Sequence, residues 1–351
     1  MSTPIVSSTV QSWLTPLNPR HFLRNGHLQT LAGNFLPRSI SLPQPETLLV
    51  EVDGPVAGPG YGYGPSYVLC HCHWQPEQVR AQRLTIVLVH GLEGSSSSQY
   101  MLGNAAHASA AGFNVIRMNM RSCGGTDDIC PTIYHSGRSS DVAAVLAKVV
   151  RTHQLESIAL VGYSMGGNLV LKFAGEVAST PPPQLKAVVG VSPLMDLAVS
   201  SAALHEPQNR IYEWHFLRNM IARVRRRANL FPEIYGGAEI SKIHTMRLFD
   251  EHIVARYGGF AGADDYYHSV ASSQYAGRLS IPTLILHSVD DPFIRLLPST
   301  RDALIANPNV TFIETTYGGH CAFLESPGPG YDGRWAEKTL VGFLREISSG
   351  I

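Results

Sequence analysis

The chain has 351 residues, and its 27 Lys and Arg residues balance its 27 Asp and Glu residues. A balanced charge gives no net field toward nucleic acid or an anionic membrane, so we expect no nucleic-acid partner. No apolar run approaches the ~20 residues that a membrane-spanning helix needs, so any membrane contact is expected to be peripheral. The length suits one large α/β domain with an insertion, and the composition does not indicate an oligomeric state.

Five cysteines, an odd number with no regular spacing, argue against a disulfide framework and fit a reducing compartment. Residues 1–17 have neither a basic stretch nor a continuous apolar stretch, so they are not expected to be a secretory signal. We therefore expect a soluble, cytoplasmic protein.

The first predicted strands are residues 47–52 and 67–73, whereas residues 24–30 are too irregular to be assigned. Residues 54–65 are rich in glycine and proline, which is typical of a surface loop. Cys70, His71, Cys72 and His73 look at first like metal ligands. Alternation along a strand sends the cysteines to one face and the histidines to the other, which favours an ordinary strand over a metal site.

A series of aliphatic runs predicts the buried part of the fold. The expected strands are residues 84–89, 113–119, 157–161, 186–192, 283–287 and 310–314, with a helix over 137–153 and other helical segments between them. Strands that alternate with helices predict an α/β fold, with a mostly parallel central sheet covered by helices on both faces.

The alternation stops between residues 196 and 277, where the sequence predicts helices over 212–229 and 247–257 and no strand. We interpret 196–277 as a helical cap inserted into a core formed by residues 1–195 and 278–351. The basic run 223–227 fits a solvated helix face better than a phosphate contact. The aromatic residues of the predicted cap either shape an acyl pocket or belong to ordinary core. They are Tyr212, Trp214, Phe216 and Phe231.

The stretch Gly162-Tyr163-Ser164-Met165-Gly166-Gly167 follows a predicted strand and opens a helical pattern. This G-x-S-x-G pattern predicts a nucleophile elbow, in which a strained turn holds the Ser164 hydroxyl clear of the sheet. Gly162 and Gly166 leave room where strand and helix pass close together.

A serine hydroxyl needs a base, and that base needs an acid to fix its tautomer. His320 follows the last predicted strand, and Asp290 and Asp291 follow the preceding one. The chain order serine, acid, histidine is that of α/β-hydrolases. We predict Asp291 as the acid, because Asp-Pro-x-Ile resembles the acid turn of these enzymes, with Asp290 as a helper.

The loop after the strand 84–89 contains His90-Gly91-Leu92, and it can turn a backbone N–H toward Ser164. The predicted oxyanion hole consists of the backbone amides of Leu92 and Met165. This chemistry requires no metal and no organic cofactor.

Taken together, these motifs resemble the YheT-like branch of the α/β-hydrolase superfamily, also called the AB hydrolase-4 family of esterases and lipases. The stretches that carry the resemblance lie in order over residues 20–325: 25–30 (NGHLQT), 90–95 (HGLEGS), 134–137 (YHSG), 162–169 (GYSMGGNL), 249–251 (FDE), 265–267 (DYY), 290–293 (DDPF) and 319–320 (GH).

The resemblance implies Ser164, Asp291 and His320 as the triad, and hydrolysis of esters with medium or long acyl chains. Two features depart from the family pattern. Ser122 stands where the family often has the first glycine of Arg-Gly-Cys-Gly-Gly. The N-terminal membrane helix of the eukaryotic relatives is also absent, so the substrate is a soluble ester or a lipid reached by peripheral contact.

The expected function is therefore that of a serine carboxylester hydrolase acting on a small-molecule or lipid ester through an acyl-enzyme. Two alternatives remain open at this point. An acyltransferase would use the same acyl-enzyme with an alcohol or thiol acceptor, and a binding protein could use the same scaffold without catalysis.

Overall fold

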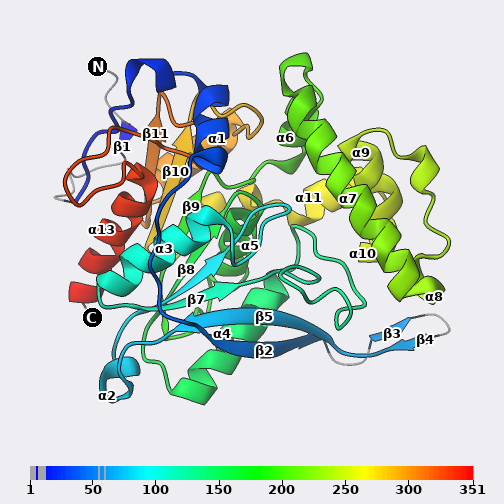
Figure 1. The fold of residues 1–351 in the computed structure, drawn as a ribbon, viewed down its shortest axis with the longest axis horizontal. Coiled ribbons are helices and arrows are strands. Elements are labelled where there is room, and N and C mark those ends of the chain that lie inside the picture. Colours follow the sequence, from blue (N-terminus) through cyan, green and yellow to red (C-terminus); the bar gives the residue numbers. More distant parts are fainter. Residues whose placement is uncertain (1–4, 7–12, 54–55, 59–60, 351) are drawn as a thin grey trace.

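The computed structural model describes residues 5–6, 13–53, 56–58 and 61–350. Its centre is a nine-stranded sheet with the order β1-β11-β10-β9-β8-β6-β7-β5-β2 (Figure 1). The strands are β1 (Ile5–Val6), β2 (Glu46–Asp53), β5 (Ser66–His73), β6 (Thr85–Val89), β7 (Asn114–Met118), β8 (Ile158–Tyr163), β9 (Leu185–Val191), β10 (Thr283–Ser288) and β11 (Val310–Thr315).

The six strands β11, β10, β9, β8, β6 and β7 run parallel, whereas β1, β5 and β2 pair antiparallel at the two edges. The eight predicted strands are all present, and the prediction of a mostly parallel sheet is confirmed. The sequence analysis missed β1, because a two-residue edge strand has no periodicity to detect.

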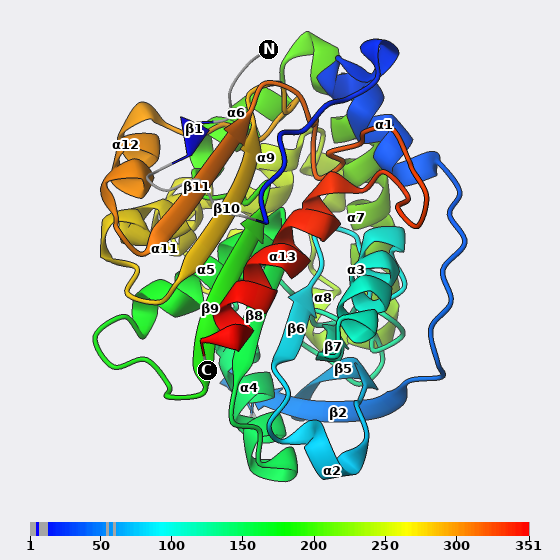
Figure 2. The ribbon, with the colours of Figure 1, turned by 90° about the vertical axis from the view of Figure 1, so that its left-hand side faces the viewer.

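Helices cover both faces of the sheet, as predicted. The helices α3 (Gln99–Ala110) and α13 (Trp335–Ser349) lie across one face, where Figure 2 shows them in front of the strands. On the other face are α4 (Ser139–His153), α5 (Met165–Glu176) and α12 (Pro298–Ala306). Every residue of β6 and β8 is buried, which explains their continuous aliphatic sequence.

The loop assignment of residues 54–65 was wrong in part. Residues 56–58 and 61–63 form a hairpin of β3 (Val56–Gly58) and β4 (Tyr61–Tyr63) beyond the ends of β2 and β5 (Figure 1), while 54–55 and 59–60 lie outside the described residues. The glycine- and proline-rich composition concealed this short pairing.

The unassigned stretch 24–30 begins the helix α1 (Gly26–Phe35), which follows the 3₁₀ turn η1 (His21–Leu23). The Asn25 side chain caps α1 by accepting a hydrogen bond from Leu28 N–H (3.1 Å).

The predicted absence of a secretory signal concerns residues 1–17, and most of these lie outside the described residues.

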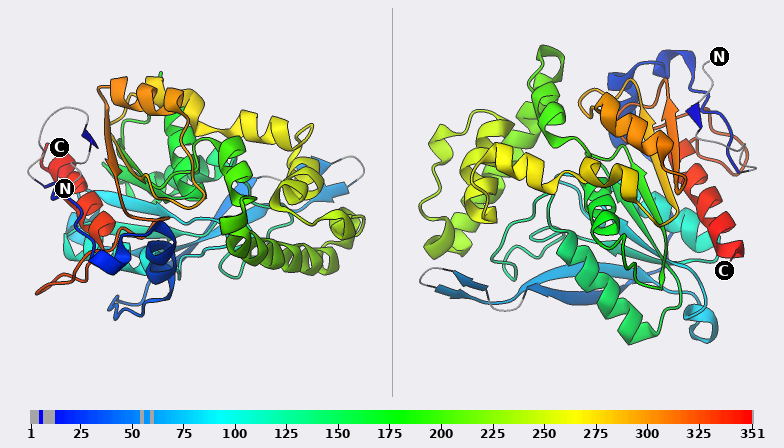
Figure 3. Two further views of the ribbon diagram at one scale, coloured as in Figure 1. Left: turned by 90° about the horizontal axis from the view of Figure 1, so that it is seen from above. Right: turned by 180° about the vertical axis from the view of Figure 1, so that it is seen from behind.

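Between β9 and β10 the chain forms helices and no strand, and these helices stand beside the sheet in Figure 1 and in the two further views of Figure 3. They are α6 (Leu197–Leu204), η2 (Pro207–Asn209), α7 (Arg210–Leu230), α8 (Pro232–Tyr235), η3 (Ile240–Lys242), α9 (Met246–Phe249), the π-helix η4 (Asp250–Ala255), α10 (Arg256–Gly258), α11 (Ala263–Val270) and η5 (Ser272–Arg278). One further short helix, α2 (Glu77–Arg80), precedes β6.

The predicted helix 212–229 corresponds to α7, but the predicted helix 247–257 is broken into α9, η4 and α10. A π turn widens the helix by one residue, and hydrophobic periodicity in the sequence does not reveal this change.

Among the described helices, none is both long enough and apolar enough to cross a bilayer.

The basic run on α7 is only partly a solvated face. Arg225 and Arg226 are exposed, but Arg227 is fully buried and donates hydrogen bonds to the carbonyls of Cys130 and Pro131. Arg223 donates to the Glu93 carboxylate (3.1 Å). The prediction of a solvated face is therefore wrong for Arg223 and Arg227, because α7 packs against a loop of the core.

The side chains of β5 alternate as predicted. Cys70 and Cys72 are buried in the core, whereas His71 hydrogen-bonds Ser96 Oγ (2.7 Å) and His73 accepts from Arg117 (3.3 Å). The cysteines and histidines thus point to opposite faces of the sheet.

Candidate active site

Ser164 occupies a sharp turn between β8, which ends at Tyr163, and α5, which begins at Met165. Its backbone has φ 52° and ψ −117°, a conformation that costs a non-glycine residue energy and that surrounding structure must hold in place. A Cβ on Gly162 would lie 2.1 Å from the Gly166 carbonyl oxygen, and one on Gly166 would lie 2.4 Å from that of Val89. Glycine at both positions therefore permits the strained turn.

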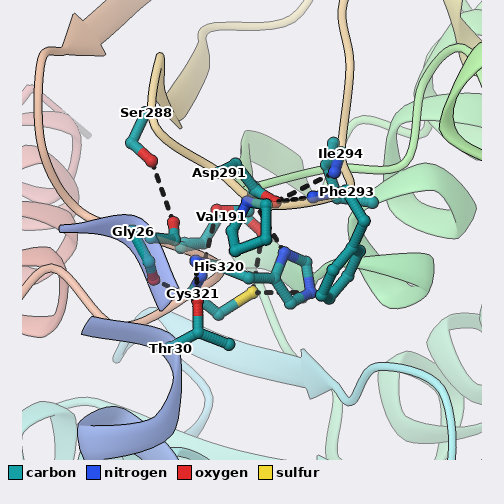
Figure 4. A network of polar contacts seen from close by, with 12 residues as sticks. Gly26, Thr30, Val191, Ser288, Asp291, Phe293, Ile294, His320 and Cys321 are labelled. Atoms are coloured by element: carbon teal, nitrogen blue, oxygen red, sulfur yellow. Dashed lines mark hydrogen bonds and ion pairs between the residues drawn. The ribbon is translucent and has the colours of Figure 1, made fainter. Parts of the chain in front are cut away.

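His320 and Asp291 form an acid–base pair (Figure 4). Nδ1 of His320 is 2.8 Å from Oδ2 of Asp291, and Oδ1 of Asp291 accepts the backbone N–H groups of Phe293 (3.1 Å) and Ile294 (2.9 Å). Because the carboxylate accepts at Nδ1, Nε2 of a neutral His320 remains free to accept a proton.

Asp290 has a different place. Its Oδ1 accepts the backbone N–H of Gly319 (2.9 Å), directly before His320. Asp291 thus contacts the imidazole, and Asp290 contacts the backbone of the same loop. Burial raises the pKa of Asp290, although the Gly319 N–H opposes that effect.

His320 packs on Phe293 (4.5 Å between ring centroids), which lines the same cavity as Ser164, but no hydrogen bond joins Ser164 Oγ to His320 in the described part of the chain. Nε2 of His320 instead lies 3.6 Å from Sγ of Cys321 (Figure 4). The same sulfur lies 3.7 Å from the carbonyl oxygen of Val191, the strand partner of Tyr163. The ring nitrogen that the catalytic hypothesis assigns to Ser164 therefore contacts a thiol in this structure.

The neighbours of the pair set its protonation. Burial disfavours the charged form of His320, but Cys321 and the Asp291 carboxylate outweigh this and raise the His320 pKa well above its ordinary value. For Asp291, burial favours the protonated acid, yet His320 and the Ile294 N–H keep its pKa below the ordinary value. The pair is thus electrostatically stabilised with the proton on the histidine.

The two residues whose amides are predicted to form an oxyanion hole line the same cavity as Ser164. Leu92, Met165 and Ser164 all line this cavity, and neither amide N–H donates to an acceptor among the described residues. Met165 is the first residue of α5, where backbone N–H groups lack intrahelical partners. Both donors are therefore available to a bound ligand.

His90 fixes the loop that carries Leu92. Its Nε2 accepts the Met120 N–H (3.0 Å), so the proton lies on Nδ1, which donates to the carbonyl of Gly91 (2.8 Å). Burial lowers the His90 pKa to about 4, which keeps this ring neutral.

The sequence analysis gave no role to α1, which holds the His320 loop. Thr30 Oγ1 accepts the backbone N–H of His320 (2.9 Å) and donates to the carbonyl of Gly26 (2.7 Å). Gln29 bonds the backbone of Leu324 through both atoms of its amide, and a Cβ on Gly26 would lie 1.7 Å from the Asp290 carbonyl oxygen. The stretch 25–30 was visible as a motif, but its contacts lie about 290 residues away in the chain.

The cavity beside Ser164 is mostly apolar, and helices of the insertion form much of its wall. Of the four aromatic residues considered for an acyl pocket, only Phe216 lines it. Tyr212 packs on Phe293 (5.3 Å between ring centroids), Trp214 is 59% exposed, and Phe231 packs against Arg227. Of the two alternatives, the pocket role therefore applies to Phe216 and not to Tyr212, Trp214 or Phe231.

Ser122, which replaces a family glycine, has φ 53°. It keeps the left-handed conformation that glycine adopts without strain, and its carbonyl accepts a hydrogen bond from Arg223. Ser122 thus adopts a conformation that is open to glycine without strain, and Arg223 of α7 contacts this loop.

His107, Asp332 and Glu337 are spaced as metal ligands could be, within the described residues. Arg38 already pairs with both carboxylates, at 2.5 Å from Asp332 and 2.6 Å from Glu337. A guanidinium therefore occupies the place that a metal ion would take.

Comparison with known sequences relates the chain to hydrolases. The α/β-hydrolase fold family matches residues 85–235. The chain is 30% identical over 311 residues to the esterase YheT of Escherichia coli (strain K12), covering 87% of this chain and 86% of that protein. It is 28% identical to human phospholipase ABHD3 over 248 residues, and this match spans 60% of that protein.

Comparison with solved structures supports the fold. The esterase Pf2001 of Pyrococcus furiosus superposes with a TM-score of 0.55 at 14% identity, over 89% of this chain and 97% of that one. A 2,6-dihydroxy-pseudo-oxynicotine hydrolase gives 0.55 at 15% identity, over 92% and 72%. The α/β-hydrolase fold expected from the sequence is confirmed.

Proposed function

Because the chain belongs to the YheT-like branch of the α/β-hydrolase superfamily and is a hydrolase of the esterase and lipase type, we propose that it is a serine carboxylester hydrolase. In this proposal Ser164 is the nucleophile, His320 the base and Asp291 the acid. The observation that carries it is the 2.8 Å contact between His320 and Asp291 beside a serine in a strained elbow.

Catalysis proceeds through an acyl-enzyme. Ser164 Oγ attacks the ester carbonyl while His320 Nε2 takes its proton, and the amides of Leu92 and Met165 stabilise the oxyanion. His320 then protonates the departing alcohol, and water deacylates the serine with His320 again acting as base. For the first step, His320 Nε2 must exchange its contact with Cys321 for one with Ser164 Oγ, since hydrogen bonds of this kind often tighten only when substrate binds.

We further propose that residues 196–277 act as a cap over the site, and that the cavity receives a medium or long acyl chain. The apolar wall supports this substrate class, because burial of each methylene contributes about 0.8 kcal/mol. We also propose a cytoplasmic location, since the five cysteines are all free.

The test is hydrolysis of p-nitrophenyl esters from acetyl to palmitoyl by the wild type and by Ser164→Ala. We expect an optimum at one chain length and loss of at least ~10³-fold in kcat for the variant, because no other group replaces the nucleophile. Equal rates for both folded proteins would refute the assignment of Ser164.

A second pair of variants separates the adjacent aspartates. We expect Asp291→Asn to lower kcat by on the order of 10³- to 10⁴-fold, because the wrong histidine tautomer is then favoured. The matched Asp290→Asn retains an oxygen that can accept the Gly319 N–H and should lose far less. A larger loss for Asp290→Asn would reverse the two roles.

A further inference from the structure

Asp250 is an acidic residue that lines the same cavity as Ser164. It begins the π-helix η4 and belongs to the stretch 249–251, which the catalytic proposal leaves without a role. Among the described residues that line this cavity, Asp250 is the only acidic one. A carboxyl group in such a wall is costly unless it is paired, so its presence needs an explanation.

Asp250 belongs to a short chain of hydrogen bonds that joins three elements. Tyr267 of α11 donates its hydroxyl to Oδ2 of Asp250 (2.6 Å), and Ser201 of α6 therefore donates to the Tyr267 oxygen (2.8 Å). Ser201 and Tyr267 also line the cavity. These three residues, named here the Asp250 cluster, form one hydrogen-bonded polar group in a mostly apolar wall.

No cation neutralises Asp250 in the described structure. The nearby guanidinium of Arg247 pairs with the exposed Asp264 (2.8 Å). The Tyr267 hydroxyl is the single hydrogen-bond donor to the Asp250 side chain among the described residues, which leaves Oδ1 without a donor on a residue that lines the cavity. Burial raises the Asp250 pKa to about 7.

This arrangement offers acceptors to a ligand. When Asp250 is ionised, the Tyr267 proton is engaged by Asp250 and the Ser201 proton by Tyr267, so the remaining capacity is the lone pairs of Asp250 and Ser201. A ligand must therefore donate. A hydroxyl suits the apolar surroundings better than an ammonium group, whose desolvation in such a wall is far more costly.

We propose that the Asp250 cluster is a subsite that binds a hydroxyl group of the substrate, and that the preferred esters carry a hydroxyl remote from the scissile bond. This inference rests on the proposed esterase function and narrows its substrate class. The acyl chain fills the apolar cavity, and its hydroxyl donates to Asp250.

The experiment compares p-nitrophenyl esters of matched acyl chains with and without a terminal hydroxyl, over a range of chain lengths. At the best length we expect kcat/KM to be about tenfold higher for the hydroxy ester, the effect of one hydrogen bond to a charged or buried acceptor. In Asp250→Leu this ratio should fall to one or below, because the variant offers only apolar contact.

Asp264→Leu is the matched control, because it removes an exposed carboxylate of the same helical region outside the cavity. It should keep the tenfold ratio. If Asp250→Leu also keeps the ratio, Asp250 only ties α11 to η4 and the subsite is refuted. A preference for a terminal ammonium ester over the hydroxy ester would likewise overturn the assignment to a hydroxyl.

Binding to Ser164→Ala separates this inference from the catalytic proposal. The thermal stability of that variant is measured with a straight-chain α,ω-diol and with the alkanol of the same length. Greater stabilisation by the diol, abolished by the additional Asp250→Leu change, supports the subsite even if no ester is hydrolysed. Ester hydrolysis that depends on Ser164 without any hydroxyl preference leaves the esterase proposal intact and refutes the subsite.

Discussion

The thiol of Cys321 contacts the nitrogen of His320 that the proposed mechanism uses as the base. Its sulfur lies 3.6 Å from Nε2 of His320, and it raises the His320 pKa together with Asp291. A base must be unprotonated to accept the Ser164 proton, so activity should disappear as the pH falls through the His320 pKa. The residue beside the histidine thus influences the working pH range.

We expect Cys321→Ala to move the acidic limb of the kcat/KM profile to lower pH, because removal of the sulfur lowers the His320 pKa. The profile is measured with one p-nitrophenyl ester for the wild type, Cys321→Ala and Cys70→Ala. Cys70 is buried in β5, and its loss should not move the limb. If the acidic limb of the Cys321→Ala profile lies at the same pH as that of the wild type, the thiol does not influence the His320 pKa.

At the scale of elements, α1 holds the His320 loop, which is far away in the chain. Thr30 supplies the acceptor for the His320 N–H, and a buried donor without a partner costs about 1–3 kcal/mol. A small displacement of a catalytic group reduces turnover strongly, by as much as ~10²-fold for about 1 Å.

We therefore expect Thr30→Val to lower kcat by about 10- to 100-fold with little change in KM. The substitution removes the acceptor for the His320 N–H, and residue 30 does not line the cavity. Thr30→Ser keeps the oxygen and should retain most of the activity. Steady-state kinetics give kcat and KM for both variants. An equal kcat for Thr30→Val and wild type would show that α1 does not help to position His320 for catalysis.

At the scale of the whole molecule, α7 fastens the helical insertion to the core through Arg227. The guanidinium is fully buried, donates to two core carbonyls and lies 4.9 Å from the centre of the Tyr235 ring. Its truncation removes these bonds together with the packing of the side chain.

We expect Arg227→Ala to lower the free energy of unfolding by about 2–3 kcal/mol, as large buried truncations commonly do. Arg225→Ala changes an exposed residue on the same helix and should stay within about 0.5 kcal/mol of wild type. Urea unfolding measures both. An equal, small effect of the two variants would mean that Arg227 does not hold the insertion to the core.

The sequence by itself determined the elements whose pattern is local. The aliphatic strands, the glycines of the elbow around Ser164, and the order of Ser164, Asp291 and His320 are all visible there, because backbone strain and strand burial restrict the residue types nearby. The choice of Asp291 over Asp290 also came from a local pattern, and the structure places Asp291 against the imidazole.

Only the tertiary structure decided what depends on contacts between distant segments. It brought Thr30 to the His320 loop, buried Arg227 within a run that reads as a solvated face, and placed Asp250 in the wall of the Ser164 cavity. In each case the residue type fits an ordinary surface or helix position equally well. The role of each residue depends on a partner that folding brings near it, and the spacing of residues in the sequence does not identify that partner.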